Sequence, residues 1–146
     1  LFDMNVEAEL IGCKINYHKE MDGVPVYPTV GKRWIQTADD FELPERLDQA
    51  GRIPVIMEAI RLIKRETVDR AAVGAFMPGP FTLTGQILDP DKMFLMVLKQ
   101  PGIIQGVLEK LTELLEDVRA AYLAAGADFV IIEEGGATSI SPKAFK

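Results

Sequence analysis

A repeated order of amphipathic helix followed by short apolar strand constrains the fold of this chain most. The clearest copy is a predicted helix over residues 103–125, with apolar side chains every three or four positions, then Gly126 and a buried strand over 129–132. An earlier copy has a helix over 54–66 and a strand over 72–76. Strands separated by helices favour a parallel α/β sheet, either doubly wound or closed as a (β/α)8 barrel.

Shorter elements are expected in the rest of the chain. Residues 1–4 are typical of the end of a strand, and residues 15–17 are a weaker strand candidate. Short helices are predicted over 5–11, 82–88 and 91–99, the last opened by Asp89-Pro90. The segment 18–43 has no hydrophobic period, and we interpret it as a long irregular excursion within one domain that spans residues 1–146.

Composition excludes several classes of protein. With 48% apolar residues, the 146-residue chain can form one globular domain, and its net charge of −6 argues against a nucleic-acid partner. The longest uncharged stretch, residues 71–88, is interrupted by Pro78-Gly79-Pro80, so we expect no membrane partner. The single Cys13 and single histidine predict no metal site, and the scarcity of cysteine is typical of a cytoplasmic protein.

Three segments are expected to form one site, because each directly follows a predicted strand and ligands of parallel α/β sheets bind at the carboxyl ends of strands. They are Asp3, the loop Met77-Pro78-Gly79-Pro80, and the loop Glu133-Glu134-Gly135-Gly136.

Each of these segments also has a purely structural interpretation. Asp3 either holds a cation or a proton in a reaction or caps the helix that follows it. The Pro78-Gly79-Pro80 turn is either a rigid corner or a ligand platform, towards which free amides of residues 81–84 would point. Glu133 and Glu134 are adjacent in an extended segment, so only one of them can face the barrel mouth. The Gly135-Gly136 pair either admits a planar ligand or makes a flexible loop.

Several sequence blocks together resemble one family. They are Phe2-Asp3 with Val6-Glu7-Ala8-Glu9 and Gly12-Cys13, the run from Gly74 to Leu83, Ala125-Gly126-Ala127-Asp128, and Ile140-Ser141-Pro142-Lys143-Ala144-Phe145. Together they are similar to the uroporphyrinogen decarboxylase superfamily, and most similar to its methylcobamide:coenzyme M methyltransferases and related corrinoid-dependent enzymes. The resemblance covers nearly the whole chain.

The resemblance implies a (β/α)8 barrel, of which this chain would be a central part truncated at both ends. It implies that Asp3 is the catalytic carboxylate that faces the pyrrole nitrogens of a tetrapyrrole. The implied contacts to a substrate or corrinoid are Met77, Pro78, Gly79, Phe81, Gln86, Glu134 and Gly135.

Two departures separate the activities within the superfamily. Gln86 stands where the decarboxylases have a substrate-contacting tyrosine, and Gly135 stands where they have a serine. Both favour a methyltransferase that moves a methyl group between a corrinoid such as methylcobalamin and a thiol such as coenzyme M. The alternatives are a uroporphyrinogen III decarboxylase-like lyase and a non-catalytic binding or assembly module.

The resemblance also implies partners beyond this chain. The zinc ligands of the methyltransferases, His-x-Cys and a later Cys, have no counterpart here and are expected in a missing C-terminal part. We therefore expect the isolated chain to be inactive. A tetrapyrrole or corrinoid ligand is expected, and a corrinoid protein is one candidate partner. Unpaired strand edges predict either a homo-oligomer or pairing with the rest of a longer polypeptide.

Overall fold

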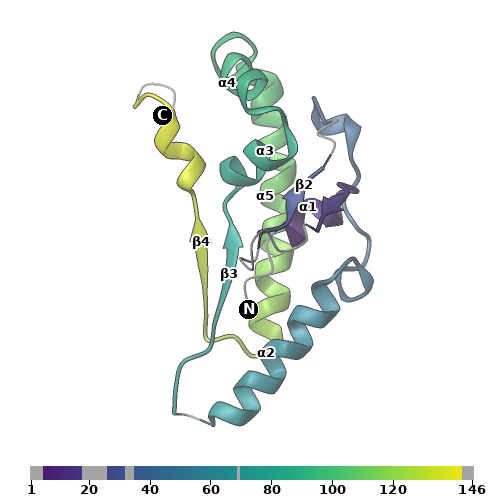
Figure 1. Cartoon of the computed structure of the whole chain (residues 1–146), viewed down its shortest axis with the longest axis vertical. Coiled ribbons are helices and arrows are strands. Elements are labelled where there is room, and N and C mark those ends of the chain that lie inside the picture. The colour runs from purple at the N-terminus through teal and green to yellow at the C-terminus, as the bar shows by residue number, and fades with distance from the viewer. Residues whose placement is uncertain (1–4, 18–25, 32–34, 69, 143–146) are drawn as a thin grey trace.

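The computed structural model describes residues 5–17, 26–31, 35–68 and 70–142. The helix α2 (Ile53–Thr67) leads into the strand β3 (Gly74–Pro78), and three consecutive helices lead from there to the strand β4 (Phe129–Glu133), as Figure 1 shows. These helices are α3 (Pro80–Ile87), α4 (Pro90–Lys99) and α5 (Pro101–Ala124). Each of them begins at a proline, which suits the first turn because its missing N–H has no partner there in any case.

The strands β3 and β4 pair in parallel, from Gly74 opposite Phe129 to Pro78 opposite Glu133. Parallel neighbours need a long crossover connection, and here α3, α4 and α5 provide it. The expectation of a parallel α/β fold is thus confirmed. In the described part of the chain this sheet has two strands, which is one repeating unit of a (β/α) barrel and not a closed one.

The core lies between this sheet and the helices. Ala75 and Met77 alternate with Gly74 and Phe76 along β3, and only the first two are buried. Figure 1 shows α5 running alongside the strands. The face that it buries repeats at helical spacing and consists of Ile104, Val107, Leu111, Leu114, Leu115, Val118 and Tyr122.

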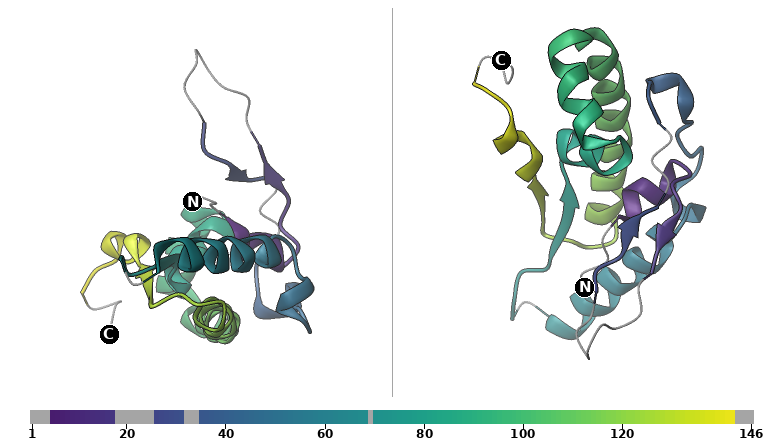
Figure 2. Two further views of the ribbon diagram at one scale, coloured as in Figure 1. Left: turned by 90° about the horizontal axis from the view of Figure 1, so that it is seen from below. Right: turned by 45° about the horizontal axis from the view of Figure 1, so that its top comes forward.

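The N-terminal part holds the helix α1 (Val6–Leu10) and two short antiparallel strands, β1 (Ile15–Asn16) and β2 (Thr29–Val30). Figure 2 shows that this strand pair lies apart from the β3–β4 sheet. The structure therefore adds a strand inside the segment 18–43, which we expected to be irregular. The same segment also contains the 3₁₀ turn η1 (Ala38–Asp40). A second 3₁₀ turn, η2 (Leu47–Gln49), follows between this segment and α2.

Side chains of Lys110 and Arg52 join parts of the chain that are distant in sequence. The Lys110 ammonium of α5 donates to the carbonyl oxygens of Ala38 and Phe41, at 2.8 and 2.5 Å. Arg52 donates from Nε to Glu9 at 2.6 Å, which links the start of α2 to α1.

Among the residues that the structure describes, no helix is both long and apolar enough to cross a membrane.

The predicted boundaries differ from the observed ones mainly around β3. The strand was expected over 72–76 and the next helix from residue 82, but the strand runs to Pro78 and α3 begins at Pro80. Pro78 is tolerated because it is the last residue of the strand, where a missing N–H costs the sheet little. The strand expected over residues 1–4 lies outside the described residues.

Candidate functional site at the carboxyl ends of the strands

The loops that follow β3 and β4 lie against each other. The backbone N–H of Gly79 donates to the carbonyl oxygen of Glu133 at 2.7 Å. The prediction that these two loops lie at the same end of the sheet is therefore confirmed. The third expected member, Asp3, lies outside the described residues.

The Glu134 carboxylate caps the first turn of α3. It accepts hydrogen bonds from the backbone N–H groups of Phe81 and Thr82 and from the Thr82 hydroxyl, each at 2.9 Å. Thr82 Oγ1 in turn accepts from the N–H of Gly136 at 3.1 Å. A carboxylate is favourable here because the first N–H groups of a helix lack partners and carry partial positive charge. We call these four residues the Glu134 clasp.

The clasp bears on the two alternatives for the Pro78-Gly79-Pro80 turn. A ligand platform would need free amides at the start of α3, but two of them, those of Phe81 and Thr82, are bonded to Glu134. The sequence could not show this, because Glu134 and Thr82 are 52 positions apart.

The lack of a side chain at Gly79 leaves space for the side chain of Glu134. A Cβ atom at this position would overlap Cγ and Cδ of Glu134. Its backbone is extended, with φ of −80°, so the requirement is for space and not for an unusual conformation. The Pro78-Gly79-Pro80 turn is therefore a close-packed corner between the two loops.

The predicted ligand contacts fall into two groups. Met77 is 1% exposed, and Pro78, Gly79 and Phe81 are also buried, so these residues form the base of the corner. Gln86 lines a cavity, Glu134 accepts the hydrogen bonds of the clasp, and Gly135 is exposed at the start of the turn η3 (Gly135–Ser139). Their contacts with a ligand remain predictions.

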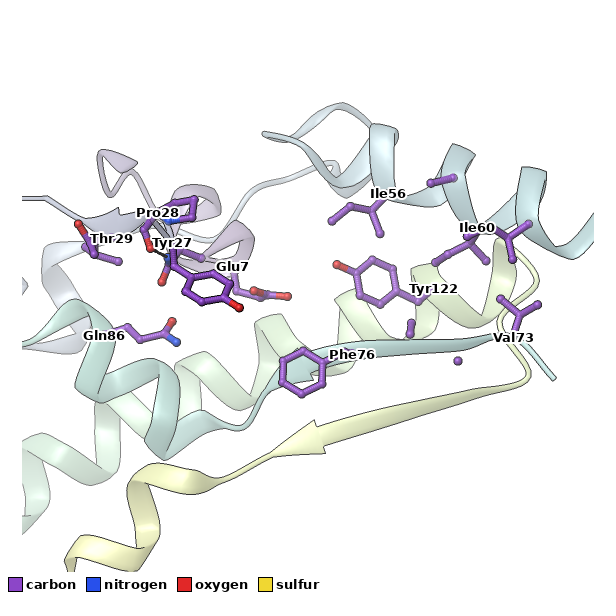
Figure 3. Close-up of a pocket in the computed structure, with 16 residues that line it drawn as sticks. Glu7, Tyr27, Pro28, Thr29, Ile56, Ile60, Val73, Phe76, Gln86 and Tyr122 are labelled. Carbon is purple, nitrogen blue, oxygen red and sulfur yellow. Dashed lines mark hydrogen bonds between the residues drawn. The ribbon is translucent and has the colours of Figure 1, made fainter. Parts of the chain in front are cut away.

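A cavity of about 680 Å³ lies beside β3, between α2 and the segments that carry α1 and β2. Figure 3 shows Glu7, Tyr27 and Gln86 near one another towards the carboxyl end of β3. Towards the other end it is lined by Ile56 and Ile60 of α2. The cavity thus has a polar end on the side where barrel enzymes place their ligands.

The polar end is held by the N-terminal segment. Asn5 donates from Nδ2 to the carbonyl oxygen of Pro28 at 2.8 Å, which fixes the strand β2 beside α1. Glu7 is only 3% exposed although it carries a carboxylate. Glu7 is not among the site residues predicted from the sequence. The available signal was a glutamate between the apolar residues Val6 and Ala8 of a short helix.

The described residues do not suit a zinc ion. They contain no group of three or more histidine, cysteine, aspartate or glutamate side chains that could hold a metal. The thiol of Cys13 is buried, and burial raises its pKa, which disfavours the thiolate that a metal would need.

Comparison with known proteins agrees with this geometry. The family model described as uroporphyrinogen decarboxylase (URO-D) matches residues 1–146, and the chain therefore belongs to this family. A solved structure of a methyltransferase from Methanosarcina mazei superimposes with a TM-score of 0.86 and is 26% identical in sequence. The match covers 99% of this chain and 43% of that one.

Curated relatives carry both activities of the family. A methylated-thiol–coenzyme M methyltransferase from Methanosarcina mazei is 25% identical over 94% of this chain, and the methylcobamide:CoM methyltransferase MtaA from Methanosarcina barkeri is 26% identical over 98%. A uroporphyrinogen decarboxylase from Psychromonas ingrahamii is 28% identical over 79%. The chain spans 36% and 42% of the length of the first two relatives and 34% of the third.

Proposed function

We propose that this chain is part of a corrinoid-dependent methyltransferase that moves a methyl group between a methylcobalamin-type corrinoid and a thiol such as coenzyme M. The observation that carries the proposal is the coverage of the relatives. Those named as methyltransferases cover 94% and 98% of the chain, whereas the decarboxylase from Psychromonas ingrahamii covers 79%.

In this proposal the chain provides part of the corrinoid site. Gln86 and the cavity beside it contact one edge of the ring, and the loops after β3 and β4, with Glu134 and Gly135, border the mouth. Asp3 is the proposed catalytic carboxylate. The zinc ion that activates the thiol would be held by residues outside the described ones. The corrinoid would be delivered by a corrinoid protein in the cytoplasm.

A decarboxylase-like lyase is the second candidate, because the family also includes uroporphyrinogen decarboxylases. The cavity argues against it. Uroporphyrinogen carries carboxylate side chains, and no arginine or lysine is among the described residues that line the cavity. Anionic groups without a cationic partner are costly to remove from water.

Ligand binding by the purified chain tests the choice. We expect equilibrium dialysis to show binding of hydroxocobalamin and weaker binding of uroporphyrin, and we expect no methyl transfer from methylcobalamin to coenzyme M. Decarboxylation of uroporphyrinogen that is abolished by Asp3→Ala and retained in Asp91→Ala would overturn the proposal. Asp91 is a suitable control because it is an exposed aspartate in the first turn of α4.

We also infer that copies of the chain associate. Ile131 and Ile132 of β4 are both 52% exposed, and each described strand of the sheet is paired on one side. Open edges with apolar side chains tend to pair. Sedimentation velocity should show association that increases with concentration and weakens in Ile131→Lys, whereas Leu98→Lys on α4 should leave it unchanged. A monomer at all concentrations would contradict this inference.

A further inference from the structure

Glu133 is the last residue of β4, and the pairing of the strands determines which face of the sheet carries its side chain. Side chains alternate between the two faces of a strand, so Glu133 lies on the same face as Ile131. Ile131 is paired with Phe76 in the parallel register, and Phe76 lines the cavity beside β3. The Glu133 side chain therefore extends from this face, which we call the Phe76 face, at the carboxyl end of the sheet.

The two adjacent glutamates differ in what their carboxylates contact. The carboxylate of Glu134 is bonded to Phe81 and Thr82 in the clasp. The Glu133 side chain is half-buried, and its carboxylate makes no hydrogen bond or ion pair with another residue in the described part of the chain. Of the two, Glu133 is thus the one whose carboxylate is available to a ligand.

The turn that follows β4 leaves space for the Glu133 carboxylate. A Cβ atom at Gly135 would overlap Oε1 of Glu133. The φ of Gly135 is not positive, so the glycine is needed here for space and not for an unusual conformation. Because Oε1 is the end of a flexible side chain, a methyl group at this position would move the carboxylate and leave the sheet in place.

The Phe76 face combines exposed apolar side chains with acceptor oxygens that lack donors. Phe76 and Ile131 are 55% and 52% exposed. Oε1 of Gln86, which lines the cavity together with Phe76, is closed off from solvent and has no hydrogen-bond partner among the described residues. A buried acceptor without a donor is unfavourable, and the soft terminal torsion of glutamine lets the amide turn towards a ligand. A ligand with an apolar body and several N–H groups suits this face.

We propose that Glu133 is a ligand-binding residue of this site, whose carboxylate accepts a hydrogen bond from an N–H group carried on an apolar framework. A charged acceptor makes a stronger hydrogen bond than a neutral one, and it can hold such a group at the edge of an apolar surface. This assignment rests on the proposed function, because the primary carboxamides around a corrin ring are N–H donors of this kind. In that role Glu133 orients the ring.

Benzamide and N,N-dimethylbenzamide test the assignment without a corrinoid, because both have a ring and a carbonyl group but only benzamide has N–H donors. In NMR titrations of the chain with labelled isoleucine methyl groups, benzamide should shift the Ile131 signals and bind more tightly than N,N-dimethylbenzamide. Glu133→Ala should weaken benzamide binding about tenfold, since a hydrogen bond to a charged group is lost. The same change should leave the binding of N,N-dimethylbenzamide as it is.

Two further variants separate binding from folding. Gly135→Ala should weaken benzamide binding as Glu133→Ala does, because the new methyl group displaces the carboxylate. Glu113→Ala, at an exposed position of α5, is the matched control and should bind benzamide like the original chain. The urea midpoint of Glu133→Ala should equal that of the original chain, because the carboxylate is bonded to no other described residue.

The outcomes distinguish a failure of this assignment from a failure of the proposed function. A preference for benzamide that depends on Glu133, without binding of hydroxocobalamin, would overturn the function and leave the assignment. Hydroxocobalamin binding that Glu133→Ala does not weaken, together with equal binding of the two benzamides, would overturn the assignment and leave the function. Equal losses of benzamide binding in Glu133→Ala and Glu113→Ala would overturn it too, because the loss would then follow from net charge.

Discussion

The two ends of the β3–β4 sheet each depend on one carboxylate, but the partners differ. At the amino end, Asp128 accepts from the Lys64 ammonium at 2.6 and 2.8 Å and from the N–H of Val73 at 2.8 Å. At the carboxyl end, Glu134 accepts from the N–H groups of Phe81 and Thr82 and from the Thr82 hydroxyl. The first carboxylate is neutralised by a cation, and the second by the dipoles of a helix end.

The two carboxylates should therefore contribute differently to stability and to ligand binding. The Lys64–Asp128 pair is exposed, and exposed ion pairs contribute little to stability. The Glu134 clasp is partly buried and fixes the loops that border the proposed ligand site. Changes at the carboxyl end should therefore affect both stability and binding, and changes at the amino end should affect stability alone.

The largest effect is expected from Gly79→Ala. The new methyl group would displace Glu134 and leave the first amides of α3 without their acceptor. Urea denaturation should show a loss of about 2–3 kcal/mol in the free energy of unfolding. Gly102→Ala in α5 is the control, because its Cβ would meet no atom within 4 Å. Equal stability of the two variants would refute the close packing of the corner.

Glu134→Ala should have the next largest effect, at about 1–2 kcal/mol, because it removes the cap without adding a clash. It should also weaken cobalamin binding several-fold by releasing the loop after β4. Glu113→Ala, at an exposed position of α5, should change neither property. Unchanged cobalamin affinity in Glu134→Ala would confine the clasp to a structural role.

The smallest effect is expected at the amino end and depends on pH. The hydrogen bond from Lys64, and then that from the Val73 amide, lower the pKa of Asp128 below its ordinary value. A depressed pKa means that Asp128 stabilises the fold above the unfolded-state pKa and that this stabilisation is lost as the pH falls through the folded-state pKa.

Urea midpoints for Asp128→Asn and the original chain should therefore differ slightly at pH 7 and converge at acidic pH. Cobalamin binding should be the same in both proteins. A difference in stability that grows on acidification would show that Asp128 does not act through its charge.

Local patterns in the sequence were sufficient for the helices α1 to α5 and for the order of helices and strands from α2 to β4, but not for the strand β2. The stripe of α5 and the stop at Gly126, whose φ is +110°, are both visible in the residues themselves. The contacts that build the site are not local. Glu134, which follows β4, bonds Thr82 in the helix that follows the neighbouring strand β3. Glu7 lines the cavity from the helix α1, whose sequence does not indicate where the helix packs.

The parallel pairing of β3 and β4 has a consequence for how the chain folds. The contacts between Val73 and Asp128, at the start of the pairing, join residues 55 positions apart. Closing so long a loop costs conformational entropy before the pairing can offset it, whereas the turns of α3, α4 and α5 form from neighbouring residues. Helix formation should therefore precede strand pairing, with the Glu134 clasp among the last contacts to form.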